Sequence, residues 1–163
     1  MSEDQLSYEP IGVIRTSFES PDGMPIQPVG DAAVEGTVEL KEAYADGLKD
    51  LDGFSHCILL YHFHAADDAA PLEVKPFLDN EQRGVFATRA PRRPNPIGLS
   101  VVEIESITDQ TVTVNGIDVV DQTPVLDIKP FVPEFDVPSD VDIGWLTASE
   151  STIHSKEADK RFL

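Results

Sequence analysis

The sequence predicts an all-β protein, a small closed or nearly closed β-barrel of six to seven strands with one or two short helices. Three observations predict this fold class. Short runs of β-branched and aromatic residues, bounded by Gly, Pro or Asp, recur along the 163 residues. Only one segment has a clear helical pattern. Short strands with open edges are prone to aggregation, so closure into a barrel is the expected arrangement.

The predicted strands follow one another at short intervals. They are residues 11–18, 32–40, 55–63, 84–88, 97–104, 111–120 and 125–129. Within 111–120, the pair Asn115-Gly116 suits a type I′ turn and predicts a hairpin.

Two segments have helical character. Residues 40–51 (LKEAYADGLKDL) are predicted to form a helix that ends at Gly53, and a second, weaker helix is predicted within 148–162. Between the last strand and this tail, the prolines of 129–140 (KPFVPEFDVPSD) indicate an extended strap.

The chain is expected to be one domain over 1–163, with the barrel at about 8–134 and the strap and C-terminal tail at 135–163. Its hydrophobic content of 40% argues against disorder. No apolar run is long enough to span a membrane, and the N-terminus MSEDQLSYEP lacks the features of a signal peptide. The single cysteine, Cys57, fits a reducing compartment. We therefore expect a cytoplasmic protein without membrane contact.

The formal net charge of −18 argues against nonspecific binding of nucleic acid at low salt. One interpretation is that the partners are not polyanions. The other, which low lysine content and patches such as HAADDAAP favour, is an acidic surface of the halophilic type suited to a high-salt cytoplasm. In that setting only a local basic cluster can recruit an anion.

One such cluster exists. Residues 83–102 (RGVFATRAPRRPNPIGLSVV) contain no acidic residue and hold four of the six arginines. Pro91, Pro94 and Pro96 restrict the backbone, so a loop with Arg89, Arg92 and Arg93 loses little entropy when it binds a carboxylate or phosphate. Asn95 adds an amide that donates and accepts hydrogen bonds. The alternative is a rigid surface loop whose arginines pair with nearby carboxylates.

Three histidines occur close together in HCILLYHFH. His62 and His64 are two residues apart and are expected on one face of a strand, which His56 begins. They suggest a metal site, histidines that line a substrate or cofactor pocket, or structural histidines of the barrel. No H-x-x-x-H motif or Cys pair supports the metal, so none is expected.

The last predicted strand carries two opposite charges. Along 125–129, Val125, Asp127 and Lys129 are expected on one face, so Asp127 and Lys129 form an ion pair or line a pocket with the arginine loop. The turn-rich stretch 20–30 (SPDGMPIQPVG) is either a connector or the edge of a pocket. No Rossmann glycine motif, P-loop or nucleophile elbow is present.

Four segments together are similar to a known family. They read PIGVIRTSF, LDGFSHCILLYHFH, GVFATRAPRRPNPIGLSVV and DVVDQTPVLDIKPF, and they span most of residues 10–131. In this order they resemble the TsaA-like (TrmO) tRNA methyltransferases. The resemblance implies a small β-barrel, typically a homodimer, that binds S-adenosyl-L-methionine outside any Rossmann fold. It implies methylation of N6 of threonylcarbamoyladenosine at tRNA position 37, next to the anticodon.

The resemblance also implies a set of cofactor contacts, carried over motif by motif. These are Ile26, Gln27, Pro28, His64, Ala65, Arg89, Leu99, Leu126, Asp127, Ile128 and Lys129. Arg89 would meet the cofactor carboxylate, while Leu99 and Leu126 would form an apolar shelf for adenine. Candidates for a general base are Asp127 and His64, and the catalytic residue stays open between them.

The remaining basic side chains suit the RNA substrate. Arg92, Arg93 and Asn95 are expected to bind tRNA, which explains a basic segment in so acidic a chain. Three alternatives stay open: a related methyltransferase with a different acceptor, a non-catalytic S-adenosyl-L-methionine- or nucleotide-binding barrel, and a metal-dependent hydrolase that uses the three histidines.

Overall fold

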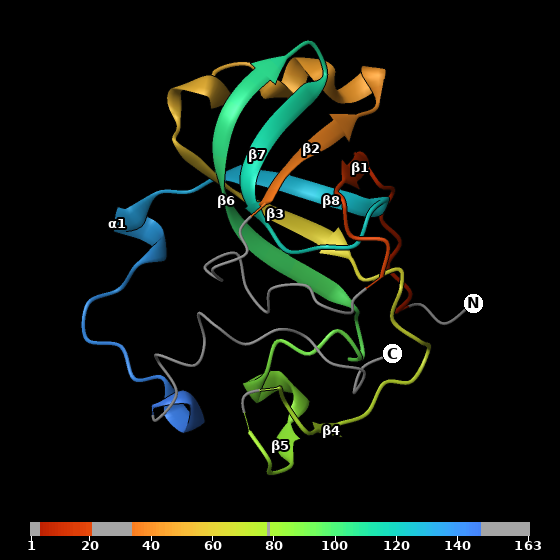
Figure 1. Ribbon diagram of the computed structural model, residues 1–163, viewed down its shortest axis with the longest axis vertical. Coiled ribbons are helices and arrows are strands. Elements are labelled where there is room, and N and C mark those ends of the chain that lie inside the picture. Colours follow the sequence, from red (N-terminus) through yellow and green to blue (C-terminus); the bar gives the residue numbers. More distant parts are fainter. Residues whose placement is uncertain (1–3, 21–33, 78, 148–163) are drawn as a thin grey trace.

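The computed structural model describes residues 4–20, 34–77 and 79–147 of the chain. Six antiparallel strands close into a barrel in the order β1-β2-β7-β6-β3-β8 (Figure 1). Their bounds are Gly12–Arg15 (β1), Val34–Leu40 (β2), His56–His62 (β3), Ile97–Thr108 (β6), Thr111–Ile117 (β7) and Thr123–Pro130 (β8). The predicted closed all-β barrel is confirmed.

The core of the barrel is made by every second residue of each strand. In β3 the inward residues Cys57, Leu59 and Tyr61 are buried and alternate with residues that are at least partly accessible. The apolar interior also holds Ile14 and Val38, both fully buried. The strands were predicted from their β-branched and aromatic residues, and this alternation shows which of those residues form the core.

A pair of short 3-10 helices replaces the helix predicted over 40–51. They span Glu42–Leu48 (η1) and Leu51–Gly53 (η2) and place Leu48 and Leu51 in the core. Asp50, between them, has a left-handed backbone with φ 69°, which interrupts a regular helix.

The hairpin predicted at Asn115-Gly116 is wrong. The turn lies between β6 and β7, where Thr108 pairs with Thr111 and Asp109 takes a φ of 54°. Asn115 and Gly116 instead lie within β7, at a bulge opposite β2, and Gly116 takes a φ of 87°. The extra residue turns Ile117 inward, so the core requirement outweighs the local turn signal.

A small lobe forms below the barrel in Figure 1. It contains β4 (Glu73–Val74), β5 (Arg83–Gly84) and the 3-10 helix η3 (Val85–Ala87), so the strand predicted at 84–88 is wrong. The reason is a separate small core, in which a tight turn buries Val85 against Val74 and Ala90.

The segment after β8 is only partly the extended strap that was predicted. It contains the helix α1 (Pro133–Asp136), which begins with a proline at its first turn, and the 3-10 helix η4 (Gly144–Leu146). Figure 1 shows this strap running along one side of the barrel down to the lobe. The helix predicted within 148–162 lies outside the described residues. No helix in the described part of the chain has the length and apolarity needed to cross a membrane.

Candidate functional site

The outer face of β6, β3 and β8 brings together residues that are distant in sequence. Leu60 on β3 pairs with Leu99 of β6 on one side and with Asp127 of β8 on the other. Directly paired residues point to the same face of a sheet, so the three side chains form one row. Leu99 and its strand neighbour Ile97 are 40% and 44% exposed, which leaves an apolar strip open beside the charged end of β8.

A bulge in β8 changes the predicted facing of its side chains. Leu60 pairs with Asp127 but Tyr61 pairs with Val125, so Leu126 is the extra residue. The predicted shared face of Val125 with Asp127 and Lys129 is therefore wrong, because Val125 points into the core. Ile128, beyond the bulge, pairs with the buried Leu59 and packs against the barrel core, so its side chain points away from the outer face.

Asp127 and Lys129 form the ion pair that the sequence allowed. Lys129 Nζ lies 2.8 Å from Asp127 Oδ2, and both side chains are well exposed. The hydrogen bond to this carboxylate is the main cause that raises the pKa of Lys129.

The histidines do not share one strand face as predicted. β3 ends at His62, and the amide of His64 donates to the carbonyl of His62 at 2.9 Å, which turns the chain away. His64 and Ala65 are exposed in the loop that follows. His56, at the other end of β3, has its Nδ1 2.8 Å from Ser55 Oγ. Among the described residues, no group of three or more His, Cys, Asp or Glu side chains converges on a metal position.

The loop after β3 is fastened to the basic loop, residues 88–96. The amide of Phe63 donates to the carbonyl of Pro96 at 2.8 Å, and Arg92 Nε lies 3.0 Å from Asp67 Oδ1. These contacts bring the segment with His64 and Ala65 beside the loop that carries Arg89.

The arginines of the basic loop differ in their surroundings. Arg93 Nη1 donates to the carbonyls of Thr88 and Ala90 at 3.0 and 3.2 Å, so it fixes the backbone on both sides of Arg89. Arg92 is mostly covered in its ion pair with Asp67. Asn95 is exposed, as is Arg89.

The lobe and the strap meet at Trp145, the single tryptophan of the chain. Its Nε1 donates to the carbonyl of Ala87 at 2.8 Å, two residues before Arg89. The guanidinium of Arg83 lies over its ring, 5.7 Å from the centroid. The strap after β8 therefore helps to hold the backbone from which Arg89 projects.

A polar chain runs inside the barrel at the end where β3 stops and β6 begins, which we call the arginine end. Tyr61 Oη lies 2.8 Å from Ser100 Oγ, and Ser100 Oγ donates to Asp118 Oδ1 at 2.5 Å. Tyr61 and Ser100 are 3% and 1% exposed. Burial raises the pKa of Asp118 to about 7, although the Ser100 hydrogen bond and the positive charge of Arg89 both lower it.

These polar residues were not predicted to form a site. Ser100, Tyr61, Asp118 and Trp145 are not among the site residues that the sequence predicts. A signal existed in β6, where the inward positions Gly98, Ser100 and Val102 place one hydroxyl in an apolar series. The partners of this hydroxyl, Tyr61 and Asp118, lie elsewhere in the sequence, and only the folded barrel brings them to Ser100.

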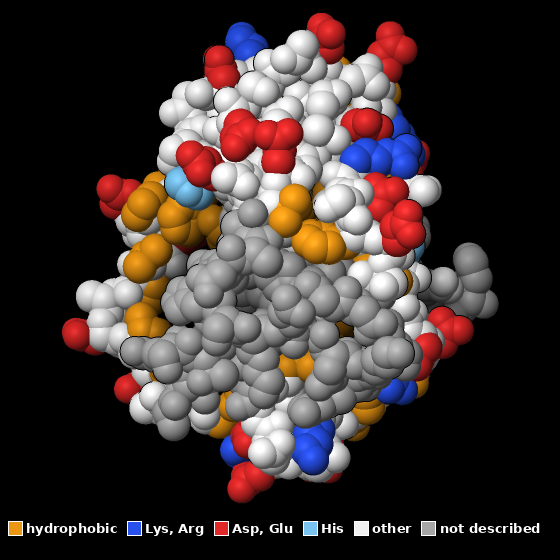
Figure 2. Space-filling view, in the orientation of Figure 1, with side chains coloured by type: hydrophobic (Ala, Val, Ile, Leu, Met, Phe, Trp, Pro, Cys, Tyr) orange, Lys and Arg blue, Asp and Glu red, His pale blue; other side chains and the backbone are white. Residues whose placement is uncertain are grey.

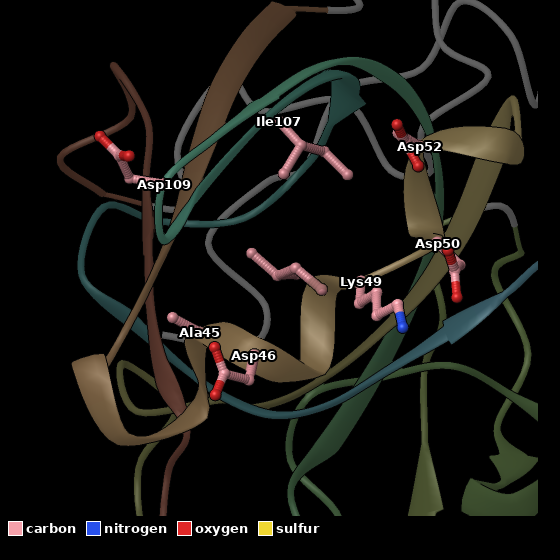
Figure 3. Close-up of a pocket in the computed structure, with 8 residues that line it drawn as sticks. Ala45, Asp46, Lys49, Asp50, Asp52, Ile107 and Asp109 are labelled. Carbon is pink, nitrogen blue, oxygen red and sulfur yellow. The ribbon is translucent and has the colours of Figure 1, made fainter.

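The other end of the barrel carries a solvent-filled hollow between η1, η2 and the β6–β7 turn (Figure 3). We call it the acidic end, because its lining includes several aspartates. The lining consists of Ala45, Asp46, Leu48, Lys49, Asp50, Asp52, Ile107 and Asp109, and the cavity measures about 640 Å³. None of these residues belongs to the predicted site. Figure 2 shows further Asp and Glu side chains scattered over the visible face.

The structure thus gathers most of the predicted site around the arginine end and the outer face of β6, β3 and β8. Leu99 and Asp127 flank Leu60, and His64 and Ala65 lie on the loop tied to that of Arg89. Ile26, Gln27 and Pro28 lie outside the described residues.

Comparison with known proteins identifies relatives along most of the chain. Residues 13–137 match the model of the tRNA-methyltransferase O N-terminal domain. A probable S-adenosyl-L-methionine-binding protein of Pyrococcus abyssi is 46% identical over 157 residues, which cover 96% of this chain and 85% of that protein. The human tRNA (adenine(37)-N6)-methyltransferase is 34% identical over 142 residues, 83% of this chain and 32% of that protein.

A solved structure shares the fold. The crystal structure of TrmO from Pseudomonas aeruginosa superposes with a TM-score of 0.72 at 40% identity, covering 86% of this chain and 62% of that one. The chain therefore spans less than two thirds of these Pseudomonas and human relatives. The family model matches most of the chain, and a solved member of the family shares its fold. The chain therefore belongs to the TsaA-like (TrmO) family.

Proposed function

We propose that the protein is an S-adenosyl-L-methionine-dependent methyltransferase that modifies tRNA at N6 of adenine 37, on N6-threonylcarbamoyladenosine. The observation that carries this proposal is that the loop after β3 is fastened to the basic loop, next to the outer face of β6, β3 and β8. The amide of Phe63 donates to the carbonyl of Pro96, and Leu60 lies in one row with Leu99 and Asp127. This arrangement supports a site that uses Arg89, His64, Leu99 and the charged pair of β8. The relatives named for S-adenosyl-L-methionine binding or tRNA methylation support the same assignment.

The described residues fit this cofactor chemically. S-adenosyl-L-methionine supplies an activated methyl group, together with a carboxylate and an adenine. The exposed Arg89 suits the carboxylate, and the open apolar surface of Leu99 with Leu126 suits the adenine. We assign the backbone of Ile128, the ion pair Asp127–Lys129, His64 and Ala65 to the border of this surface. We assign Ile26, Gln27 and Pro28 to the same pocket from the family resemblance.

Methyl transfer from a sulfonium is an in-line displacement, so positioning provides much of the acceleration. The N6 nitrogen loses a proton, and we propose Asp127 or His64 as its acceptor. Asp127 Oδ2 pairs with Lys129 Nζ at 2.8 Å, whereas His64 is exposed in the loop after β3. Comparing Asp127→Asn with His64→Gln separates them, because loss of the true acceptor lowers kcat far more than affinity for the cofactor.

We propose that Arg92, Arg93 and Asn95 bind the tRNA. We also propose that the protein is a homodimer in the cytoplasm. Their place beside Arg89 supports this role, although Arg93 also supports its own loop. Replacing Arg92 and Arg93 with alanine should weaken tRNA binding and reduce the log–log salt slope by about one per lost phosphate contact. Unchanged tRNA binding would restrict both arginines to holding the loop.

Light scattering tests the proposed homodimer, for which the expected mass is twice the chain mass of 17.9 kDa.

The same cofactor site is compatible with a related methyltransferase that acts on another acceptor. The chain covers only 32% of the human enzyme, so the match leaves most of that enzyme without a counterpart and does not fix the acceptor. Mass spectrometry of tRNA nucleosides from a deletion strain, before and after the gene is restored, decides between them. Loss and recovery of the methyl group on N6-threonylcarbamoyladenosine is expected. An unchanged nucleoside profile, with S-adenosyl-L-methionine still bound by the protein, would favour the other acceptor.

A further inference from the structure

Phe86 is a large aromatic residue that the folded lobe leaves in solvent. It is 77% exposed, although its neighbour Val85 is buried in the small core of the lobe. The backbone is held on both sides of Phe86. The amide of Val85 donates to the carbonyl of Leu72 at 2.9 Å, and the carbonyl of Ala87 accepts a hydrogen bond from Trp145 Nε1 at 2.8 Å. The turn therefore presents the Phe86 ring from a fixed backbone, which lowers the entropy cost of binding a ligand.

The part of the sequence around Phe86 differs in charge from the rest of the chain. Residues 71–96, the sequence of the lobe and the basic loop, include five basic and three acidic residues. Seven of the 12 basic residues and 27 of the 30 acidic residues lie elsewhere in the chain. Two of the three acids in 71–96, Asp79 and Glu81, form ion pairs with Arg83. A polyanion is therefore expected to approach the protein at this part of the surface.

A second exposed phenylalanine shows what distinguishes Phe86. Phe135 on α1 is 84% exposed, but it lies between Glu134 and Asp136, which are both exposed and would repel phosphates. Phe86 lies instead within the acid-free segment 83–102. An exposed ring among arginines fits single-stranded RNA, because a base stacks on the ring while the cations meet the phosphates.

We propose that Phe86 stacks on a nucleobase of the anticodon loop next to adenine 37. The inference rests on the proposed function, which supplies the RNA, and it names a substrate contact that the family resemblance did not include. Phe86 and Arg89 are three residues apart, so their Cα atoms are separated by at most about 11 Å. A neighbour of adenine 37 is within reach of the ring when adenine 37 lies at the cofactor. An adenine that enters an enzyme site leaves the stack of its neighbours, and Phe86 replaces the stacking that one neighbour loses.

A double-mutant cycle between protein and RNA tests this contact. The probes are synthetic anticodon stem-loops with N6-threonylcarbamoyladenosine at position 37, either complete or with the base removed from the nucleotide before or after it. Phe86→Ala should weaken binding of the complete stem-loop by about 5- to 150-fold. Removing the base that stacks on Phe86 should weaken binding to the unchanged protein but cause little further loss in Phe86→Ala. The salt dependence of binding should stay the same in Phe86→Ala, because stacking releases no counterions.

Three further variants separate stacking from other roles of Phe86. Phe86→Trp keeps an aromatic face and should retain RNA affinity, whereas Phe86→Leu keeps an apolar side chain without that face and should lose it. Phe135→Ala is the matched control and should bind the stem-loop like the unchanged protein. Affinity for S-adenosyl-L-methionine should be the same in every variant.

The outcomes distinguish this inference from the proposed function. Full RNA affinity in Phe86→Ala or Phe86→Leu, or additive losses with both base-free stem-loops, would overturn the stacking contact and leave the methyltransferase proposal intact. A reduced mass of Phe86→Ala in light scattering, with unchanged RNA affinity, would overturn it in favour of a contact between two copies of the chain. RNA bound through Phe86 without methyl transfer would support the stacking contact and contradict the proposed function.

Discussion

The two ends of the barrel hold their charged groups in different settings. At the acidic end, Asp46, Asp50, Asp52 and Asp109 stand around an open hollow and are exposed to solvent. At the arginine end, the carboxylate of Asp118 accepts a hydrogen bond from the buried hydroxyl of Ser100, and burial raises its pKa while the positive charge of Arg89 lowers it. Water screens the first group, whereas desolvation strengthens the interactions of the second.

This contrast shows that the net charge of −18 says little about where chemistry occurs. A dense set of exposed carboxylates provides solubility and little specific interaction energy. A single buried carboxylate changes its own protonation near neutral pH and influences its neighbours. The comparison therefore predicts large effects at the arginine end and small ones at the acidic end.

The largest expected effect is on the pH dependence of stability. The folded-state pKa of Asp118 is raised from 3.8 to about 7, so the folded protein binds more protons than the unfolded chain in this window. Stability is lost as pH rises through the window, by at most about 1.4 kcal/mol per pH unit. Relative to Asp118→Asn, the unchanged protein should lose on the order of 3 kcal/mol between pH 4.5 and 7. Urea unfolding at several pH values measures this, and parallel curves for the two proteins would show that Asp118 is not desolvated.

Next in size is the loss of the proposed cofactor contact in Arg89→Ala. Removing a charge-assisted hydrogen bond should weaken S-adenosyl-L-methionine binding by about 1.5–3 kcal/mol. The control is Arg15→Ala, an exposed arginine on β1 that pairs with Glu39 and should leave the affinity unchanged. Calorimetry measures both variants. If Arg89→Ala and Arg15→Ala bind S-adenosyl-L-methionine with equal affinity, Arg89 does not contact the cofactor and the two ends of the barrel do not differ in this respect.

A smaller effect is expected for Trp145→Phe. The change keeps a ring beneath Arg83 but removes the N–H that donates to Ala87, and should weaken cofactor binding by roughly 0.5–1 kcal/mol. Because Trp145 is the only tryptophan, its fluorescence should also respond to the cofactor in the unchanged protein. Tyr44→Phe on η1 serves as the aromatic control. If Trp145 fluorescence does not respond to the cofactor and Trp145→Phe binds the cofactor with unchanged affinity, the strap does not contribute to the site.

The smallest effect belongs to the acidic end. Replacing Asp52 and Asp109 together with asparagine should change cofactor affinity by less than about 0.5 kcal/mol, as for most exposed substitutions. A binding assay at low and high salt tests this. A larger loss of affinity would mean that the aspartates around the hollow affect cofactor binding at the arginine end.

Much of the fold could be predicted from the sequence because alternation along a strand is local. The inward residues of β3, Cys57, Leu59 and Tyr61, follow the period of two without interruption. Bulges break this rule. Leu126 and Gly116 each insert a residue whose effect depends on the partner strand, so the facing of Val125 and the supposed hairpin were predicted wrongly.

The candidate site, like the fold, contains residues that local sequence predicts and contacts that depend on how distant segments pack. Contiguous strings that resemble the family predict Arg89 and the segment 126–129 as cofactor contacts, because local sequence encodes these strings. The contact between Ser100 and Asp118 joins β6 to the residue that directly follows β7. No single segment of sequence contains it, so only the folded barrel reveals that these residues lie together.

The strand order has a consequence for how the chain reaches its native state. β8 pairs with both β3 and β1, with Val125 opposite Gly12, so the cylinder closes only after residues near position 130 are available. Closure joins the two ends of the barrel sequence and incurs the entropy of a long loop. Nascent chains on the ribosome should therefore expose the unpaired edges of β1 and β3 until synthesis has passed β8, and refolding should be slow compared with helical proteins of the same length.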